Sequence, residues 1–182
     1  MRWDALFEDL EAQLDAAEAA ELDAEVRERS RLEAAKLLLA DRLAAAEGHP
    51  VSIQTRGAGV IRGTLTQVLP EWLLVVDGAS DVLVPTSAVL VVSGLGSATA
   101  APAQGAVAGR LTLGYALRGL ARTRAGVAVV LVDGGVVHGT IDRVGADFFE
   151  ISEHPPGEAR RAGLVRAVRT VPFGAVGAVR ST

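Results

Sequence analysis

The sequence has 182 residues, of which 49% are hydrophobic, and its net charge is −4. This hydrophobic content is enough to form the core of one ordinary domain or of two small ones, and it is too high for a wholly disordered protein. It contains no cysteine, which excludes disulfides, thiolate metal sites and cysteine nucleophiles. The acidic N-terminus lacks a signal-peptide pattern and no apolar run is long enough to span a membrane, so we expect a cytoplasmic protein.

The first segment, residues 1–48, is predicted to be helical and acidic. Strong helix formers dominate it until Gly48 and Pro50, and either one long helix or a helical hairpin fits this pattern. An apolar stripe recurs at steps of three and four residues. Its members are Trp3, Leu6, Phe7, Leu10 and Leu14. A lone helix is marginal in water, so we expect the stripe to pack on this protein, on a second copy or in another protein's groove.

Short β-rich runs bounded by glycine follow the helical segment. Five of them lie in residues 49–95, a spacing typical of a small barrel. Residues 96–110 are rich in Gly, Ala and Pro and are predicted to be a linker. Residues 111–182 are predicted to form a short helix, "LTLGYALRGLARTR", and then five more strands.

The two β-rich segments are copies of one another. Val51–Val76 aligns without a gap on Val127–Ser152, and after an insertion of 11 residues Val84–Val92 aligns on Val171–Val179. The identical pairs are Gly59/Gly135, Val60/Val136, Gly63/Gly139, Thr64/Thr140, Val68/Val144, Val84/Val171, Pro85/Pro172, Ala88/Ala175 and Val89/Val176. This pattern indicates an internal duplication.

The repeated glycines have a structural explanation. Gly63 and Gly139 lie in the middle of predicted strands, where glycine permits a bend or bulge. Gly57, Gly59 and residues 133–135 lie where a hairpin turn needs positive φ. We therefore expect none of them to form a phosphate-binding loop.

The second repeat resembles the Sm/LSm family, and in particular its bacterial Hfq-type members. The resemblance is carried by a helix ending in "ALRGLARTR", then "VAVVLVDGGVVHGTIDRVGADFFEI", then "VPFGAVGAV"; the first repeat follows the same outline. It implies an α+β protein: an N-terminal α-helical segment followed by two tandem five-stranded Sm-like (SH3-type) β-barrels. Because barrel edges join subunits in that family, it also implies either intramolecular pairing of the two barrels or a small homo-oligomer through these edges.

The RNA-contact positions of that family are not kept. Where its members commonly place an aspartate and an asparagine, this chain has Gly145 and Phe149, and Leu69 and Leu73 in the first repeat. Residues 172–174 and 85–87 replace the polar triplet before the closing alanine. The resemblance therefore implies the fold without the usual uridine pocket.

The 11-residue insertion makes the second repeat basic. It brings an arginine-rich stretch with Arg160, Arg161, Arg166 and Arg169, and residues 102–182 carry ten arginines against six acids. Guanidinium groups bind phosphate through forked hydrogen bonds, so this stretch is a candidate site for nucleic acid or another anion. Pairing with the acidic helical segment, or plain solvation, explains it equally well.

Catalytic patterns are missing from the sequence. The histidines, His49, His138 and His154, have no spacing that brings two metal ligands to one face, and no Ser-His-Asp order or phosphate loop is present. We expect no enzyme activity, cofactor or metal.

The predicted function is a non-catalytic interaction or scaffold protein that uses the apolar stripe for self-association or partner docking. The alternative is binding of RNA or DNA through the arginine-rich stretch.

Overall fold

The computed structural model describes residues 2–78, 80–100, 110–157, 163 and 165–181. Within residues 2–17 it describes side chains only at positions 7, 8 and 13. The chain divides into two compact units, Met1–Leu38 and Leu39–Thr182, and each is taken by itself below.

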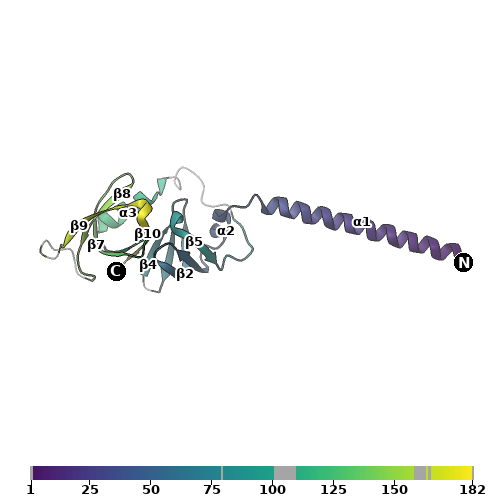
Figure 1. Cartoon of the computed structure of the whole chain (residues 1–182), viewed down its shortest axis with the longest axis horizontal. Coiled ribbons are helices and arrows are strands. Elements are labelled where there is room, and N and C mark those ends of the chain that lie inside the picture. Colours follow the sequence, from purple (N-terminus) through teal and green to yellow (C-terminus); the bar gives the residue numbers. More distant parts are fainter. Residues whose placement is uncertain (1, 79, 101–109, 158–162, 164, 182) are drawn as a thin grey trace. The chain divides into compact units, whose positions relative to one another are not determined.

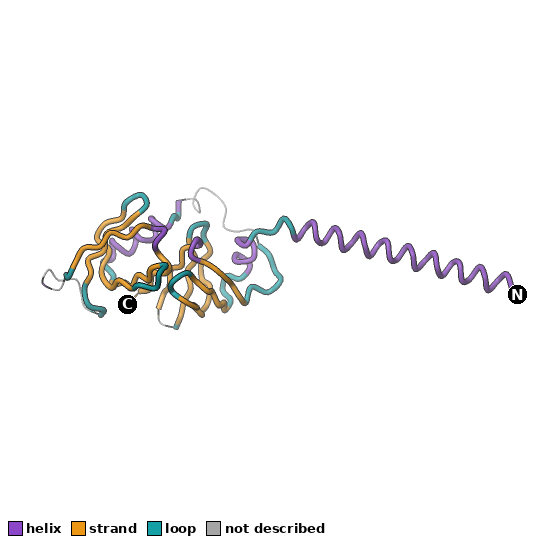
Figure 2. The backbone as a smooth tube through the Cα atoms, viewed as in Figure 1, coloured by secondary structure: helices purple, strands orange, loops and turns teal. Residues whose placement is uncertain are grey.

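The first unit contains one uninterrupted helix, α1 (Arg2–Ala34), of 33 residues (Figure 2). The segment predicted to be helical up to residue 48 is therefore not one helix, because a second, short helix, α2 (Leu39–Ala45), follows after a break. Ion pairs one turn apart support its second half: Arg29 Nη2 lies 3.3 Å from Glu25 Oε1, and Arg31 Nη1 lies 3.6 Å from Glu28 Oε2. Such pairs stabilise a helix without burying any of it.

The second unit contains all ten predicted strands and two further helices (Figure 1). The helices are α2 (Leu39–Ala45) and α3 (Leu113–Thr123), with single 3₁₀ turns η1 (Thr86–Ala88) and η4 (Phe173–Ala175). The strands are β1 (Pro50–Thr55), β2 (Gly59–Val68), β3 (Trp72–Asp77), β4 (Ser80–Pro85), β5 (Val89–Ser93), β6 (Gly126–Leu131), β7 (Val136–Val144), β8 (Phe148–Glu153), β9 (Ala167–Pro172) and β10 (Val176–Ser181).

The prediction of two closed five-stranded Sm-like barrels is wrong. The strands form one open antiparallel sheet of ten, in the order β5-β1-β2-β3-β4-β10-β6-β7-β8-β9. The physical reason is that β4 finds its second neighbour in the other repeat: Leu83 pairs with Val179, and Val82 pairs with Arg180. This pairing leaves the backbone of neither strand free to close its own half.

The duplication is visible strand by strand. Each half has the same internal order, and Trp72 faces Pro85 in the first half as Phe148 faces Pro172 in the second. Both halves also carry the same bulge, at residues 65–67 and 141–143. A second bulge skips Leu90 between β1 and β5, and another skips Gly177 between β6 and β10. The two repeats therefore share a backbone as well as a sequence pattern.

The hairpin glycines fit their predicted role, whereas the bulges predicted at Gly63 and Gly139 lie two residues farther along, at residues 65–67 and 141–143. Gly57, Gly59 and Gly134 have positive φ in the two hairpin turns, a conformation that favours glycine. At Gly63 a Cβ atom would overlap the carbonyl oxygen of Val76, and at Gly139 it would overlap that of Ser152. Both mid-strand glycines thus permit a close approach by the neighbouring strand.

Two hydrophobic clusters fill the second unit, one for each half. Leu43 of α2 lies in the first, and Leu117 of α3 lies in the second. Three residues belong to the cluster of the opposite half: Trp72 and Leu83 lie in the second cluster, and Ala178 lies in the first. The two halves therefore share side chains as well as a strand pair.

Candidate interaction surfaces

The predicted apolar stripe lies in α1. Phe7 is 59% exposed, and the side chains of Trp3, Leu6, Leu10 and Leu14 lie outside the described part of the chain. Further along α1 three more large apolar side chains are exposed. These are Leu22, Val26 and Leu32. Every large apolar side chain described in this helix therefore faces solvent within its own unit.

The arginine-rich stretch is described only in part. Arg160 and Arg161 lie outside the described residues, so the structure does not test whether the four arginines come together. Arg166 is exposed just before β9, and its N–H donates to the carbonyl of Glu153 at 2.9 Å. Arg169 lies in β9, and its Nε donates to Glu153 Oε2 at 2.8 Å. Glu153 thus partly neutralises Arg169, which lowers its attraction for a phosphate.

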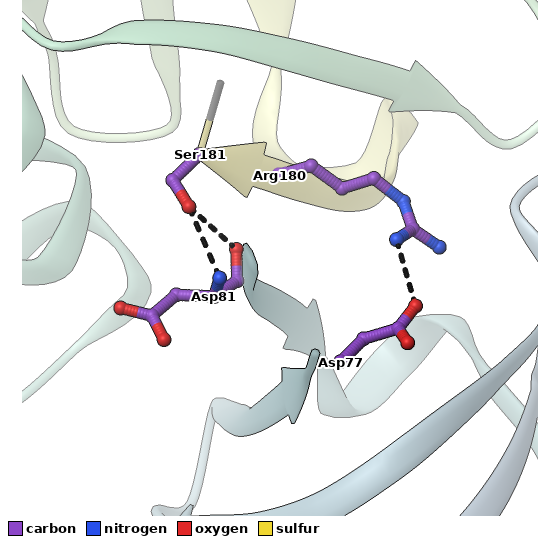
Figure 3. A network of polar contacts seen from close by, with 4 residues as sticks. All are labelled: Asp77, Asp81, Arg180 and Ser181. Atoms are coloured by element: carbon purple, nitrogen blue, oxygen red, sulfur yellow. Dashed lines mark hydrogen bonds and ion pairs between the residues drawn. The ribbon is translucent and has the colours of Figure 1, made fainter. Parts of the chain in front are cut away.

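A polar network spans the joint between β4 and β10 (Figure 3). Arg180 Nη1 lies 3.3 Å from Asp77 Oδ2. Next to it, the N–H of Asp81 donates to Ser181 Oγ at 3.0 Å, and Ser181 Oγ donates to the carbonyl of Asp81 at 3.4 Å. The N–H of Asp81 therefore points across the joint, away from β3.

The N-terminal end of α3 is anchored on the first half. Trp72 Nε1 donates to the carbonyl of Leu111 at 2.8 Å, and the N–H of Leu113 donates to Glu71 Oε2 at 2.8 Å. An apolar groove of about 470 Å³ lies beside this anchor, lined in part by Leu69, Leu74, Leu83, Tyr115 and Leu120. Both repeats contribute to it. The groove thus belongs to the joint between the halves.

The outer edges of the sheet are two further candidate surfaces. Among the described strands, β5 and β9 each pair with a single neighbour. Leu90 and Val91 on β5 and Val168 on β9 are all more than half exposed. An edge of this kind presents unpaired backbone groups to another chain. Exposed aliphatic side chains make such pairing more favourable, because they are removed from water when it occurs.

Two polar contacts were missed by the sequence analysis, and the first of them is buried. His154 is buried after β8, where its Nε2 lies 2.9 Å from Thr140 Oγ1. Asp142, an exposed residue of β7, accepts a hydrogen bond from Ser152 Oγ at 2.5 Å. Both contacts join β7 to the chain in or directly after β8. In the sequence, only the alternation of apolar and polar residues in the two strands indicated them.

The positions equivalent to family RNA contacts carry core or groove side chains. Leu73 and Phe149 are fully buried in the two clusters, and Leu69 lines the groove at the joint. Gly145 is half-buried, with the ring of Phe148 where its Cβ would be. These four positions therefore have packing roles.

Two other features, a metal-binding cluster and a membrane-spanning helix, are absent from the described part of the chain. No three His, Cys, Asp or Glu side chains there come close enough to hold a metal ion. No helix among the described residues is both long enough and apolar enough to cross a membrane. A comparison of the sequence with models of protein families gives no match, and a comparison with curated proteins gives none either.

Proposed function

We propose that the protein is a non-catalytic interaction or scaffold protein that docks on another polypeptide through α1. The observation that carries this proposal is that α1 forms a compact unit of its own while its described apolar side chains stay exposed. Exposed aromatic and aliphatic side chains gain free energy when a partner removes them from water. The docking face would be the predicted stripe, in which Phe7 is the residue with a described side chain.

The acidic character of α1 bears on the kind of partner. Glu18, Glu21, Glu25 and Glu28 are all exposed along its second half, and only some of them have an arginine nearby. A partner with a basic rim around an apolar groove would therefore complement this helix. Helix-in-groove recognition uses anchors at the spacing that the stripe has.

The test is a capture experiment with the full chain as bait. In the stripe variant, Trp3, Leu6, Phe7 and Leu10 are replaced by glutamine. The matched control replaces Leu22 and Val26 by glutamine, which removes apolar groups about as exposed as Phe7 from another part of α1. We expect the stripe variant to lose the captured proteins and the control to keep them, with unchanged circular dichroism in both. Equal capture by both variants would contradict the proposal.

Binding of RNA or DNA through the arginine-rich stretch is the alternative, and the described residues support it less. Arg169 already donates to Glu153, and the backbone N–H of Arg166 donates to the carbonyl of the same residue. A labelled RNA titration at low and high salt tests it. Salt-dependent binding that disappears when Arg160, Arg161, Arg166 and Arg169 become alanine would favour the alternative. Descent of the two repeats from an Sm-like ancestor is likewise a proposal, and its support is the sequence resemblance of the repeats to that family.

A further inference from the structure

We propose that the two free sheet edges are complementary, so that β9 of one copy pairs with β5 of a second copy and repeats the β4–β10 joint between chains. The inference goes beyond the proposed function, because it needs neither α1 nor a foreign partner. It follows from the duplication. The free strand β9 is the copy of β4, and the free strand β5 is the copy of β10, yet β4 and β10 pair with each other.

The equivalence of the edges extends to single residues. β4 and β9 have the same bounds at an offset of 87 residues, and Val84 faces Leu73 as Val171 faces Phe149. The same offset relates β5 to β10. When the residue pairs observed between β10 and β4 are shifted by this offset, Val92 of one copy lies opposite Thr170 of the other, and Ser93 lies opposite Arg169. The register between copies is thus specified.

The side chains of β5 show what a second copy would cover. Ala178 of β10 is 0% exposed because it packs into the cluster of the opposite half. Its equivalent on β5 is Val91, which is 52% exposed. In the proposed pairing Val91 enters the second cluster of the neighbouring copy. On the other edge, the exposed Thr170 is the equivalent of Leu83, which is 6% exposed in the internal joint, so the same contact covers Thr170.

The helix that precedes each half supports the same arrangement. Leu113, the first residue of α3, is 5% exposed because α3 is anchored on Glu71 and Trp72. Leu39, the first residue of α2, is 50% exposed. The equivalents of Glu71 and Trp72 in the second half are Asp147, which is exposed, and Phe148, which is half-buried. In the proposed pairing, Leu39 of one copy lies against Asp147 and Phe148 of the other copy. This contact repeats the internal one between Leu113 and the pair Glu71 and Trp72.

Several features of the internal joint are not repeated at the outer edges. Ser93 stands where Arg180 stands in β10, so the ion pair with Asp77 has no counterpart. Leu90 stands where Gly177 lies against the carbonyl of Arg56, so the strand end near Leu90 must lie farther from its neighbour. The pairing between copies is therefore weaker than the internal joint. We expect it to depend on protein concentration.

A contact between two different edges is heterologous. Each copy that joins leaves one β5 edge and one β9 edge free, so further copies add in the same direction until a ring closes or a filament grows. This property separates the proposal from symmetric dimerisation through one edge or through α1. It also supplies the test.

The experiment uses the full chain and measures mass by light scattering at increasing concentration, starting from the monomer mass of 18.8 kDa. Val91→Lys blocks the β5 edge with a charge, and Val168→Pro blocks the β9 edge. Val168 is the copy of Asp81, whose N–H points away from β3, so proline there removes an outward donor and no bond to β8. Val60→Lys, at a similarly exposed position of β2, is the matched control.

We expect the natural chain and the control to assemble as concentration rises, and each edge variant to stay monomeric. A mixture of the two edge variants should form a dimer of twice the monomer mass, because each supplies the edge that the other lacks. A natural chain that stays monomeric would overturn the proposal. Assembly of both edge variants to the natural size would also overturn it and would assign assembly to α1.

A second measurement does not depend on the folding of the blocked variants. The chain has no cysteine, so Ser93→Cys and Arg169→Cys can be made in separate chains and mixed under mild oxidation. Residues opposite each other in an antiparallel pair are close enough for a disulfide. We expect a crosslinked heterodimer from this mixture and none from Ser93→Cys mixed with Val60→Cys. Equal crosslinking in both mixtures would overturn the register. The stripe variant of α1 should crosslink normally, so failure of one proposal leaves the other standing.

Discussion

Arg180 Nη1 lies 3.3 Å from Asp77 Oδ2, so the last strand of the chain is ion-paired with the third. The two residues are 103 positions apart, and they lie on opposite sides of the joint that unites the two repeats (Figure 3). Both side chains are partly exposed, so water and salt screen their attraction. The ion pair therefore marks the joint more than it stabilises it.

Asp77→Asn tests how little this ion pair contributes. We expect the free energy of unfolding to fall by less than about 1 kcal/mol, the range typical of exposed ion pairs. Urea denaturation of both proteins at low and high salt measures it, and the difference should shrink at high salt. A large loss that is independent of salt would show that the pair acts as a buried one.

Leu83→Ala tests whether the halves unfold together. Leu83 belongs to the first repeat but is buried in the second cluster, so its truncation should cost about 2–5 kcal/mol and weaken both halves. Leu90→Ala, at an exposed position on the outer strand β5 of the same repeat, should cost less than about 0.5 kcal/mol. Thermal unfolding followed by calorimetry should give one transition for the sheet in each case. Two separated transitions would contradict the shared core.

Gly139→Ala tests the close approach of β7 and β8. The added Cβ would overlap the carbonyl oxygen of Ser152, so we expect a loss of about 1–3 kcal/mol from the strain it introduces. Gly119→Ala is the opposite case, because Gly119 lies inside α3 with open space around it. That change should raise stability by about 0.4–1 kcal/mol. Denaturant midpoints of the two variants should therefore move in opposite directions.

Thr140→Val tests the buried contact with His154. The substitution keeps the shape but leaves Nε2 of a buried histidine without its hydroxyl partner, at a cost of about 1–3 kcal/mol. Thr66→Val is the control, since Thr66 is exposed and its hydroxyl bonds only to the carbonyl of Leu74. Its cost should be below about 1 kcal/mol. Equal losses for the two variants, measured by urea denaturation, would contradict a special role for the buried pair.

Removal of residues 1–34 tests the independence of the two units. Both hydrophobic clusters are made of residues from the second unit, so the truncated chain should keep the unfolding transition of the sheet. Far-ultraviolet circular dichroism should lose the helical signal of α1 and retain the rest. A sheet that unfolds at a much lower temperature after truncation would contradict the division.

Much of the local structure could be predicted from the sequence, because it depends on residues near each other in the chain. Alternation of apolar residues predicted all ten strands, and the glycine pairs predicted turns at Gly57 and Gly134 with positive φ. The offset of 76 residues identified the duplication. The bulges at residues 65–67 and 141–143, repeated at that offset, show that each half keeps one backbone pattern.

The contacts of the candidate surfaces were less accessible to sequence reasoning. Thr140 and His154 meet because β7 and β8 pair, and no spacing along the chain indicates a contact between a hydroxyl and an imidazole. The stripe in α1 was readable from periodicity, whereas the free edges were not. An edge is defined by which strands lack a second neighbour, and that depends on every other pairing in the sheet.

By itself, the sequence determined the helices, the strands and their repetition, since these follow from periodicity, turn chemistry and short-range sterics. Only the tertiary structure decided that the halves share one sheet. The pairing of Leu83 with Val179 is made by backbone groups that every residue has, so side-chain patterns do not select it over closure of each half. The single sheet is favoured by packing that the two halves share, because Leu83 and Trp72 of the first half lie in the second cluster and Ala178 of the second half lies in the first cluster. Such packing exists only once both halves are folded.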